Sequence, residues 1–148
     1  MGCILGLDYG RRRIGVAVSD ELGLTAQPVA TWSNLKWEQV VDNICAWIKK
    51  RSIERVIVGL PLNLRGEKGH LALEVEQFVG KLKRHISVPV ILWDERFTSV
   101  QSKRILHTLH QKPSQKKERI DLIASVLLLQ NYLDYQRNIT ARSQGEEN

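Results

Sequence analysis

Residues 3–20 read CILGLDYGRRRIGVAVSD, and this stretch decides the fold. Two apolar segments, residues 3–9 and 13–19, are separated by a short turn centred on Gly10. In the second segment large apolar side chains alternate with small ones, which is the period of a strand with two different faces. The stretch therefore predicts a β-hairpin whose first strand ends near Asp8.

The segments that follow predict a mixed α/β sheet. A third strand is expected at about residues 24–32, at the sheet edge, because Pro28 would remove a hydrogen bond from a central strand. Helical periodicity begins at Lys36, and a continuous apolar run at residues 56–60 indicates a buried parallel strand. A helix, a fifth strand and two further helices complete the order βββαβαβαα. We expect one domain over residues 1–136 and a frayed tail over residues 137–148.

Composition limits the class of protein. A chain of 148 residues suits one domain with a single core. Its 22 Lys and Arg against 16 Asp and Glu give a net charge of +6, which favours a polyanionic partner such as nucleic acid, although a merely solvated surface is the alternative. Two distant cysteines and the absence of a long apolar run predict a cytoplasmic protein that does not enter a membrane.

Acidic residues follow two of the predicted strands. Right-handed crossovers would make the first, fourth and fifth strands parallel, so that Asp8 and the Asp94-Glu95 pair meet at one edge of the sheet. Asp121, at the start of the last helix, is the candidate third acid. Carboxylates from separate elements can hold Mg²⁺ and leave positions for phosphate oxygens. The alternatives are that Asp8 caps the Gly10 turn and that Asp121 merely stabilises a helix N-terminus.

Four blocks of sequence resemble the YqgF (RuvX) family, which is related to the Holliday junction resolvase RuvC. The first is the hairpin motif quoted above, with LGLDYG followed by RIGVAVSD. The others, in family order, are VGLPL at residues 58–62 with Gly66 and Gly69, DERFTS at residues 94–99, and DLIAS at residues 121–125. Together they cover most of the chain to about Leu133. Four blocks in order within so short a chain form a specific signal.

The resemblance implies a ribonuclease H-like fold, a five-stranded mixed sheet in the order 3-2-1-4-5 flanked by helices. It also implies that Asp8, Glu95 and Asp121 are the catalytic, metal-binding acids, with Mg²⁺ as the cofactor and Mn²⁺ as a substitute. The expected reaction is cleavage of phosphodiester bonds in structured RNA, such as a pre-16S rRNA, or in branched DNA. Ser99 and Ser125 depart from the family pattern, which leaves the fold and metal site intact but warns against assuming an identical substrate.

Basic residues near the proposed acids are candidate substrate contacts. Guanidinium groups of Arg11, Arg12 and Arg13 could bind phosphates in the hairpin turn, whereas Arg96 could equally pair with a neighbouring acid. Lys112, Lys116 and Lys117 are expected in a loop that could contact a nucleic-acid backbone, or that is simply solvated.

Several other motifs are better explained by structure. Gly59, Gly66 and Gly69 do not form a P-loop and are expected to shape a turn. His107 and His110 lack the partners of a metal site and are expected at the surface. Trp37 and Trp47 lie beside the apolar positions of a helix, so core packing is expected there.

Two other functions fit parts of the sequence. An ATP-binding domain of the actin and sugar-kinase type has a phosphate loop similar to Gly6–Gly10, but such proteins close two domains around the nucleotide. A non-catalytic, RNA- or ribosome-associated module would keep the acids without turnover. Junction cleavage requires two cuts, so a homodimer on the substrate is a further expectation.

Overall fold

A computed structural model describes residues 2–114 and 116–146 of the chain, and its centre is a mixed sheet. In chain order the strands are β1 (Ile4–Tyr9), β2 (Arg13–Ser19), β3 (Ala26–Ser33), β4 (Arg55–Leu60) and β5 (Val90–Asp94). Their order across the sheet is β3-β2-β1-β4-β5, with β1, β4 and β5 parallel and β2 antiparallel to both of its neighbours, β1 and β3. The predicted order 3-2-1-4-5 is confirmed.

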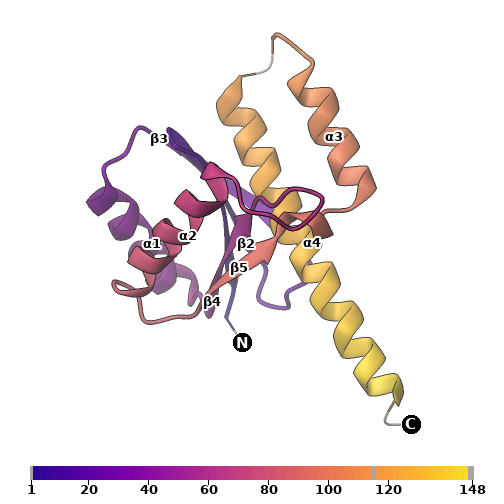
Figure 1. Cartoon of the computed structure of the whole chain (residues 1–148). Helices are drawn as coiled ribbons and strands as arrows, with labels where there is room; N and C mark the ends of the chain where they lie inside the picture. Colours follow the sequence, from indigo (N-terminus) through magenta and orange to yellow (C-terminus); the bar gives the residue numbers. More distant parts are fainter. Residues whose placement is uncertain (1, 115, 147–148) are drawn as a thin grey trace.

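Helices cover both faces of this sheet (Figure 1). They are α1 (Trp37–Arg51), α2 (His70–Lys83), α3 (Val100–His110) and α4 (Lys117–Glu146), with a short 3-10 turn, η1 (Glu95–Phe97), after β5. Buried residues of α1 and α2 pack against one face, and the middle of α4 packs against the other. Helix α3 lies beside the first half of α4.

The two-residue period of the strands decides which side chains reach which face. In β1, Leu5 and Leu7 belong to the core under α1 and α2, whereas Ile4 belongs to the core under α4. Gly6 also faces α4, because a Cβ built on it would lie 2.9 Å from Leu129 Cβ. Continuing the alternation places Asp8 on the α4 face and Tyr9 on the opposite face.

Small residues let α4 lie unusually close to the hairpin. A Cβ on Gly15 of β2 would lie 2.1 Å from the Asp121 carbonyl oxygen, so only glycine permits the observed approach. The Thr31 hydroxyl also donates a hydrogen bond to the Glu118 carbonyl, which joins β3 to the first turn of α4. These contacts fix the N-terminal end of α4 over the hairpin.

The end of the chain differs from the expected frayed tail. Residues 137–146 continue α4 as regular helix. The side chains of residues 137–145 are exposed, so the sequence correctly indicated that this segment has little to bury. The loss of apolar contacts therefore does not coincide with the end of the helix, which continues to Glu146.

Candidate active site

Asp8 lies at the carboxyl end of the central strand β1, in a small pocket on the α4 face. The pocket has a volume of about 200 Å³, and Glu95 and Asp121 also line it. The three acids, far apart in sequence, therefore converge on one rim of the sheet. No described residue donates a hydrogen bond to the Asp8 carboxylate, so the cap of the Gly10 turn is not its role; instead the Gly10 amide donates to the Arg13 carbonyl.

Glu95 reaches the pocket because its two neighbours make room for it. Asp94 ends β5, accepts a hydrogen bond from the Arg96 amide and pairs with the Arg96 guanidinium at 2.7 Å. This pairing leaves the Glu95 side chain free to turn toward β4. There Gly59 lacks a side chain, and a Cβ on it would lie 2.5 Å from Glu95 Oε1. Gly59 lies inside β4 and not in the turn expected from the sequence, and its lack of a side chain makes space for the Glu95 carboxylate.

Asp121 stands in the second turn of α4, close to β2. Its carboxylate accepts a hydrogen bond from Arg13 Nε at 2.6 Å, and both side chains are partly buried. Arg13 shares the α4 face with Gly15 because the two are separated by one residue in the strand. The hairpin therefore supplies both an acid and the cation that holds the third acid.

The acids disturb one another electrostatically. Burial first, and then the negative charges of Glu95 and Asp121, together raise the pKa of Asp8 from 3.8 to about 7. Burial also raises the pKa of Glu95, with a second contribution from Asp94. A buried carboxylate that lacks both a hydrogen bond and an ion pair is costly, and a bound cation would remove that cost.

The carboxylate oxygens of the three acids are ligands that a hard divalent cation prefers, although the three side chains do not form a complete coordination shell. Among the described residues, no three His, Cys, Asp or Glu side chains are close enough to form a complete ligand set. Asp121 is turned toward Arg13 in this arrangement. Mg²⁺ does not require such a cage, because it usually binds through one or two carboxylates and keeps several waters.

The predicted basic residues divide into several groups. Arg12 and Lys117 line a hollow of about 410 Å³ together with Asp8 and Asp121, so both lie beside the acidic pocket. Arg11 pairs with Glu74 of α2 at 2.9 Å. Arg96 pairs with Asp94, the alternative considered from the sequence. Lys112 and Lys116 are exposed in the connection between α3 and α4, whereas Lys117 is the first residue of α4 and not part of a loop.

Two polar residues line the acidic pocket in a role that the sequence did not predict. Thr98 follows η1, and His110 ends α3; both line the pocket with the acids. His110 is exposed, as expected, but it is also a pocket residue. Its spacing from His107 gave no indication of this, because its position depends on how α3 folds back along α4.

Comparison of the sequence with models of protein families identifies the family of this chain. The family model described as "RuvX: Holliday junction resolvase" matches residues 2–135. The chain belongs to the RuvX family. As a RuvX-family member it is a nuclease, an enzyme that hydrolyses phosphodiester bonds.

Relatives within the RuvX family are similar along most of their length. A protein of Chloroflexus aggregans named "Putative pre-16S rRNA nuclease" is 44% identical over 135 residues, which cover 91% of this chain and 95% of that protein. A protein of the same name from a Sulfurihydrogenibium species is 46% identical over 136 residues, covering 90% and 91%.

Solved structures confirm the ribonuclease H-like fold of this RuvX-family chain. Thermus thermophilus RuvC, solved with a Holliday junction substrate, superposes with a TM-score of 0.59 at 15% identity, covering 92% of this chain and 97% of that one. The fowlpox virus Holliday junction resolvase gives a TM-score of 0.55 at 16% identity, covering 90% and 99%. At such identities the likeness concerns the fold alone.

No helix among the described residues is long and apolar enough to cross a membrane.

Proposed function

We propose that this chain is a Mg²⁺-dependent endonuclease that cuts structured nucleic acid in the cytoplasm, with Asp8, Glu95 and Asp121 holding the metal. The observation that carries the proposal is the convergence of these three carboxylates, from β1, η1 and α4, on one pocket at the carboxyl end of the central strands. Mg²⁺ bound there would activate the attacking water and stabilise the leaving oxygen, and Mn²⁺ would substitute for it.

Charged residues of this chain have different roles around the metal and the phosphates. Asp8 is the central carboxylate, since the charges of both other acids act on it. Arg12 and Lys117 border the same rim and supply positive charge for the phosphates on either side of the scissile bond. Arg13 holds the Asp121 carboxylate in place, and its guanidinium would be available to substrate if Asp121 were to bind a metal.

The substrate that we favour is a precursor of 16S rRNA, because relatives above 40% identity carry that name. Four-way DNA junctions are the second candidate, because the family description names a Holliday junction resolvase. Resolution of a junction needs two cuts, so we expect two copies of the chain on one junction. Light scattering with and without junction DNA measures this directly.

The test of catalysis compares two Asp→Asn variants on both substrates. Asp8→Asn removes the central carboxylate charge at nearly constant shape, whereas Asp42→Asn makes the same change at an exposed position of α1. We expect Asp8→Asn to slow cleavage by on the order of 10²–10³-fold or more, the scale for loss of one preorganised electrostatic group, and Asp42→Asn to leave the rate unchanged.

Circular dichroism of both variants verifies that the fold is kept. Undiminished cleavage by Asp8→Asn would disprove the proposed site. A wild-type protein that binds RNA in a salt-sensitive manner but cuts neither substrate with Mg²⁺ or Mn²⁺ would instead support the non-catalytic module.

A further inference from the structure

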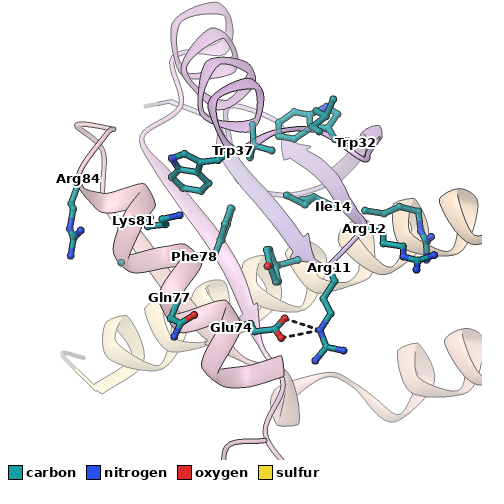
Figure 2. A pocket seen from close by; sticks show the side chains of 16 residues that line it. Arg11, Arg12, Ile14, Trp32, Trp37, Glu74, Gln77, Phe78, Lys81 and Arg84 are labelled. Carbon is teal, nitrogen blue, oxygen red and sulfur yellow. Dashed lines mark hydrogen bonds and ion pairs between the residues drawn. The ribbon is translucent and has the colours of Figure 1, made fainter. Parts of the chain in front are cut away.

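A larger hollow, shown in Figure 2, lies on the face of the sheet that α1 and α2 cover, opposite the face that carries Asp8. Its volume is about 560 Å³, within the range of small-ligand sites. The β1–β2 turn, the end of β3, the start of α1 and one side of α2 form its walls. We call it the aromatic pocket, because Tyr9, Trp32, Trp37 and Phe78 are among the residues that line it.

Aromatic rings line the aromatic pocket. The Tyr9 and Phe78 rings lie 4.8 Å apart, and Trp37 meets Phe78 edge to face at 5.6 Å. Figure 2 shows Trp37 and Phe78 adjacent in the wall, with Trp32 on the β3 side. Trp32 and Trp37 pack partly on the core, as expected for Trp37, but both also remain accessible from the pocket. Such rings offer stacking surfaces to a planar heterocycle.

Positive charge surrounds these rings. The lining includes Arg11, Arg12, Lys81 and Arg84, with Glu74 as the acid, and Glu74 is already paired with Arg11. Lys81 Nζ lies 5.0 Å from the centre of the Trp37 ring. Within the described part of the chain, the guanidinium groups of Arg12 and Arg84 have no hydrogen bond or ion pair. The pocket is therefore complementary to an aromatic ring that carries an anionic group.

Gly80 keeps part of this pocket open. It lies inside α2, where glycine weakens a helix relative to alanine. A Cβ built on Gly80 would meet no atom within 4 Å, so packing against the core does not require glycine there. The position is instead a pocket wall, and a large side chain placed on it would extend into the free space.

The aromatic pocket and the acidic rim are joined through the hairpin turn. Asp8 and Tyr9 are consecutive in β1, so their side chains point to opposite faces of the sheet. The hollow beside Asp8 and Asp121 shares residues 9–13 with the aromatic pocket. A nucleic-acid strand with a phosphate beside Asp8 therefore needs to cross only this turn to bring a neighbouring base to Tyr9, Trp37 and Phe78.

We propose that the aromatic pocket binds one unstacked nucleotide of the substrate strand, next to the phosphate at the acidic pocket. The base stacks among the aromatic rings, and the arginines of the turn bind its phosphate. This rests on the proposed function in one respect, that the substrate is nucleic acid. It adds that the enzyme holds an unpaired nucleotide, which favours substrates with single-stranded or distorted segments beside the cut.

The test uses two single-stranded octamers with equal charge, oligo(dA) and a chain of eight abasic sites, in EDTA so that no cleavage occurs. Wild-type protein is expected to bind oligo(dA) about 5- to 100-fold more tightly than the abasic chain, the scale of one base–aromatic stack, and its tryptophan fluorescence should be quenched. Gly80→Leu is expected to abolish both the difference and the quenching, while Gly80→Ala keeps them. Thermal melts of the two variants verify folding.

Equal affinity of wild-type protein for the two octamers would overturn the proposal, as would a base preference that Gly80→Leu leaves intact. We expect an acidic peptide that contains aromatic residues to displace neither octamer. If such a peptide bound wild-type protein but not Gly80→Leu, and wild-type protein showed no preference for oligo(dA), the pocket would belong to a protein partner and the proposal would be wrong. Because these measurements require no turnover, they can fail while Asp8→Asn still abolishes cleavage, and the reverse also holds.

Discussion

Asp8 shows how one side chain acquires its chemistry from its surroundings. An aspartate at the end of an apolar strand has two ordinary explanations, a turn cap or a ligand to a cation. The structure separates them, because the carboxylate accepts no hydrogen bond from the described residues and lies in a pocket with two further acids. Its pKa of about 7 records the resulting electrostatic cost.

This raised pKa predicts how the stability of the metal-free protein depends on pH. Between pH 3.8 and about 7 the unfolded chain has released the Asp8 proton, whereas the folded chain retains it. The contribution of Asp8 to stability therefore falls as the pH rises through this window. Asp8→Asn removes the effect. In EDTA we therefore expect the free energy of unfolding of Asp8→Asn, relative to that of wild-type protein, to rise from pH 4 to pH 7 by on the order of 1–4 kcal/mol. Urea unfolding at a series of pH values measures it, and parallel curves for the two proteins would contradict the electrostatic account.

At the scale of elements, the hairpin and α4 form the site together. Gly6 and Gly15 on the α4 face of β1 and β2 let the helix approach, and that approach places Asp121 beside Arg13. The alternation in residues 13–19 was sufficient to predict the strand. It did not indicate that the small residues make room for one particular helix.

Gly15→Ala tests this approach of α4. The added Cβ would lie 2.1 Å from the Asp121 carbonyl oxygen, so the helix must move. We expect a loss of stability of about 1–3 kcal/mol, typical of overpacking, together with reduced cleavage because Asp121 is displaced. Gly69→Ala is the matched control, since a Cβ there meets nothing within 4 Å and the residue lies outside the sheet. Thermal unfolding and cleavage rates that are the same for both variants would show that α4 does not depend on Gly15.

Sequence reasoning recovered the elements better than their depth of packing or their ends. Period-two and helical patterns located every strand of the sheet, and the topological rules brought Asp8 and Glu95 to the same edge. The ion pair between Arg13 and Asp121 joins residues 108 positions apart, and no local pattern indicates it. Thr98 and His110 reach the pocket through the path of η1 and α3, which the sequence does not define. The helical extension over residues 137–146 was missed because its side chains at residues 137–145 are exposed and leave no apolar period in the sequence.

At the scale of the whole molecule, part of the positive charge behind the net charge of +6 lies beside the acidic pocket. Arg12 and Lys117 lie along the rim that contains the acids, so the positive charge is placed where a polyanion would have to approach the carboxylates. Binding through such contacts releases counterions and weakens as salt is added.

Salt dependence separates these contacts from the general charge of the surface. Arg12→Gln is expected to reduce the slope of log K against log salt by about 1, as loss of one phosphate contact does. Arg142→Gln makes the same change of charge on the exposed extension of α4 and should leave the slope nearly unchanged. Fluorescence anisotropy with junction DNA or precursor RNA measures both slopes. If the two variants behave alike, the rim is not the binding surface.

The binding of a divalent cation by three acids from three elements is the central claim, and anomalous diffraction from a crystal soaked in Mn²⁺ tests it most directly. We expect a peak within ligand distance of the Asp8 carboxylate, with oxygens of Glu95 or Asp121 or both as further ligands and Asp121 released from Arg13. A fully soaked crystal with no peak among the three acids, or with Mn²⁺ bound elsewhere only, would contradict the claim.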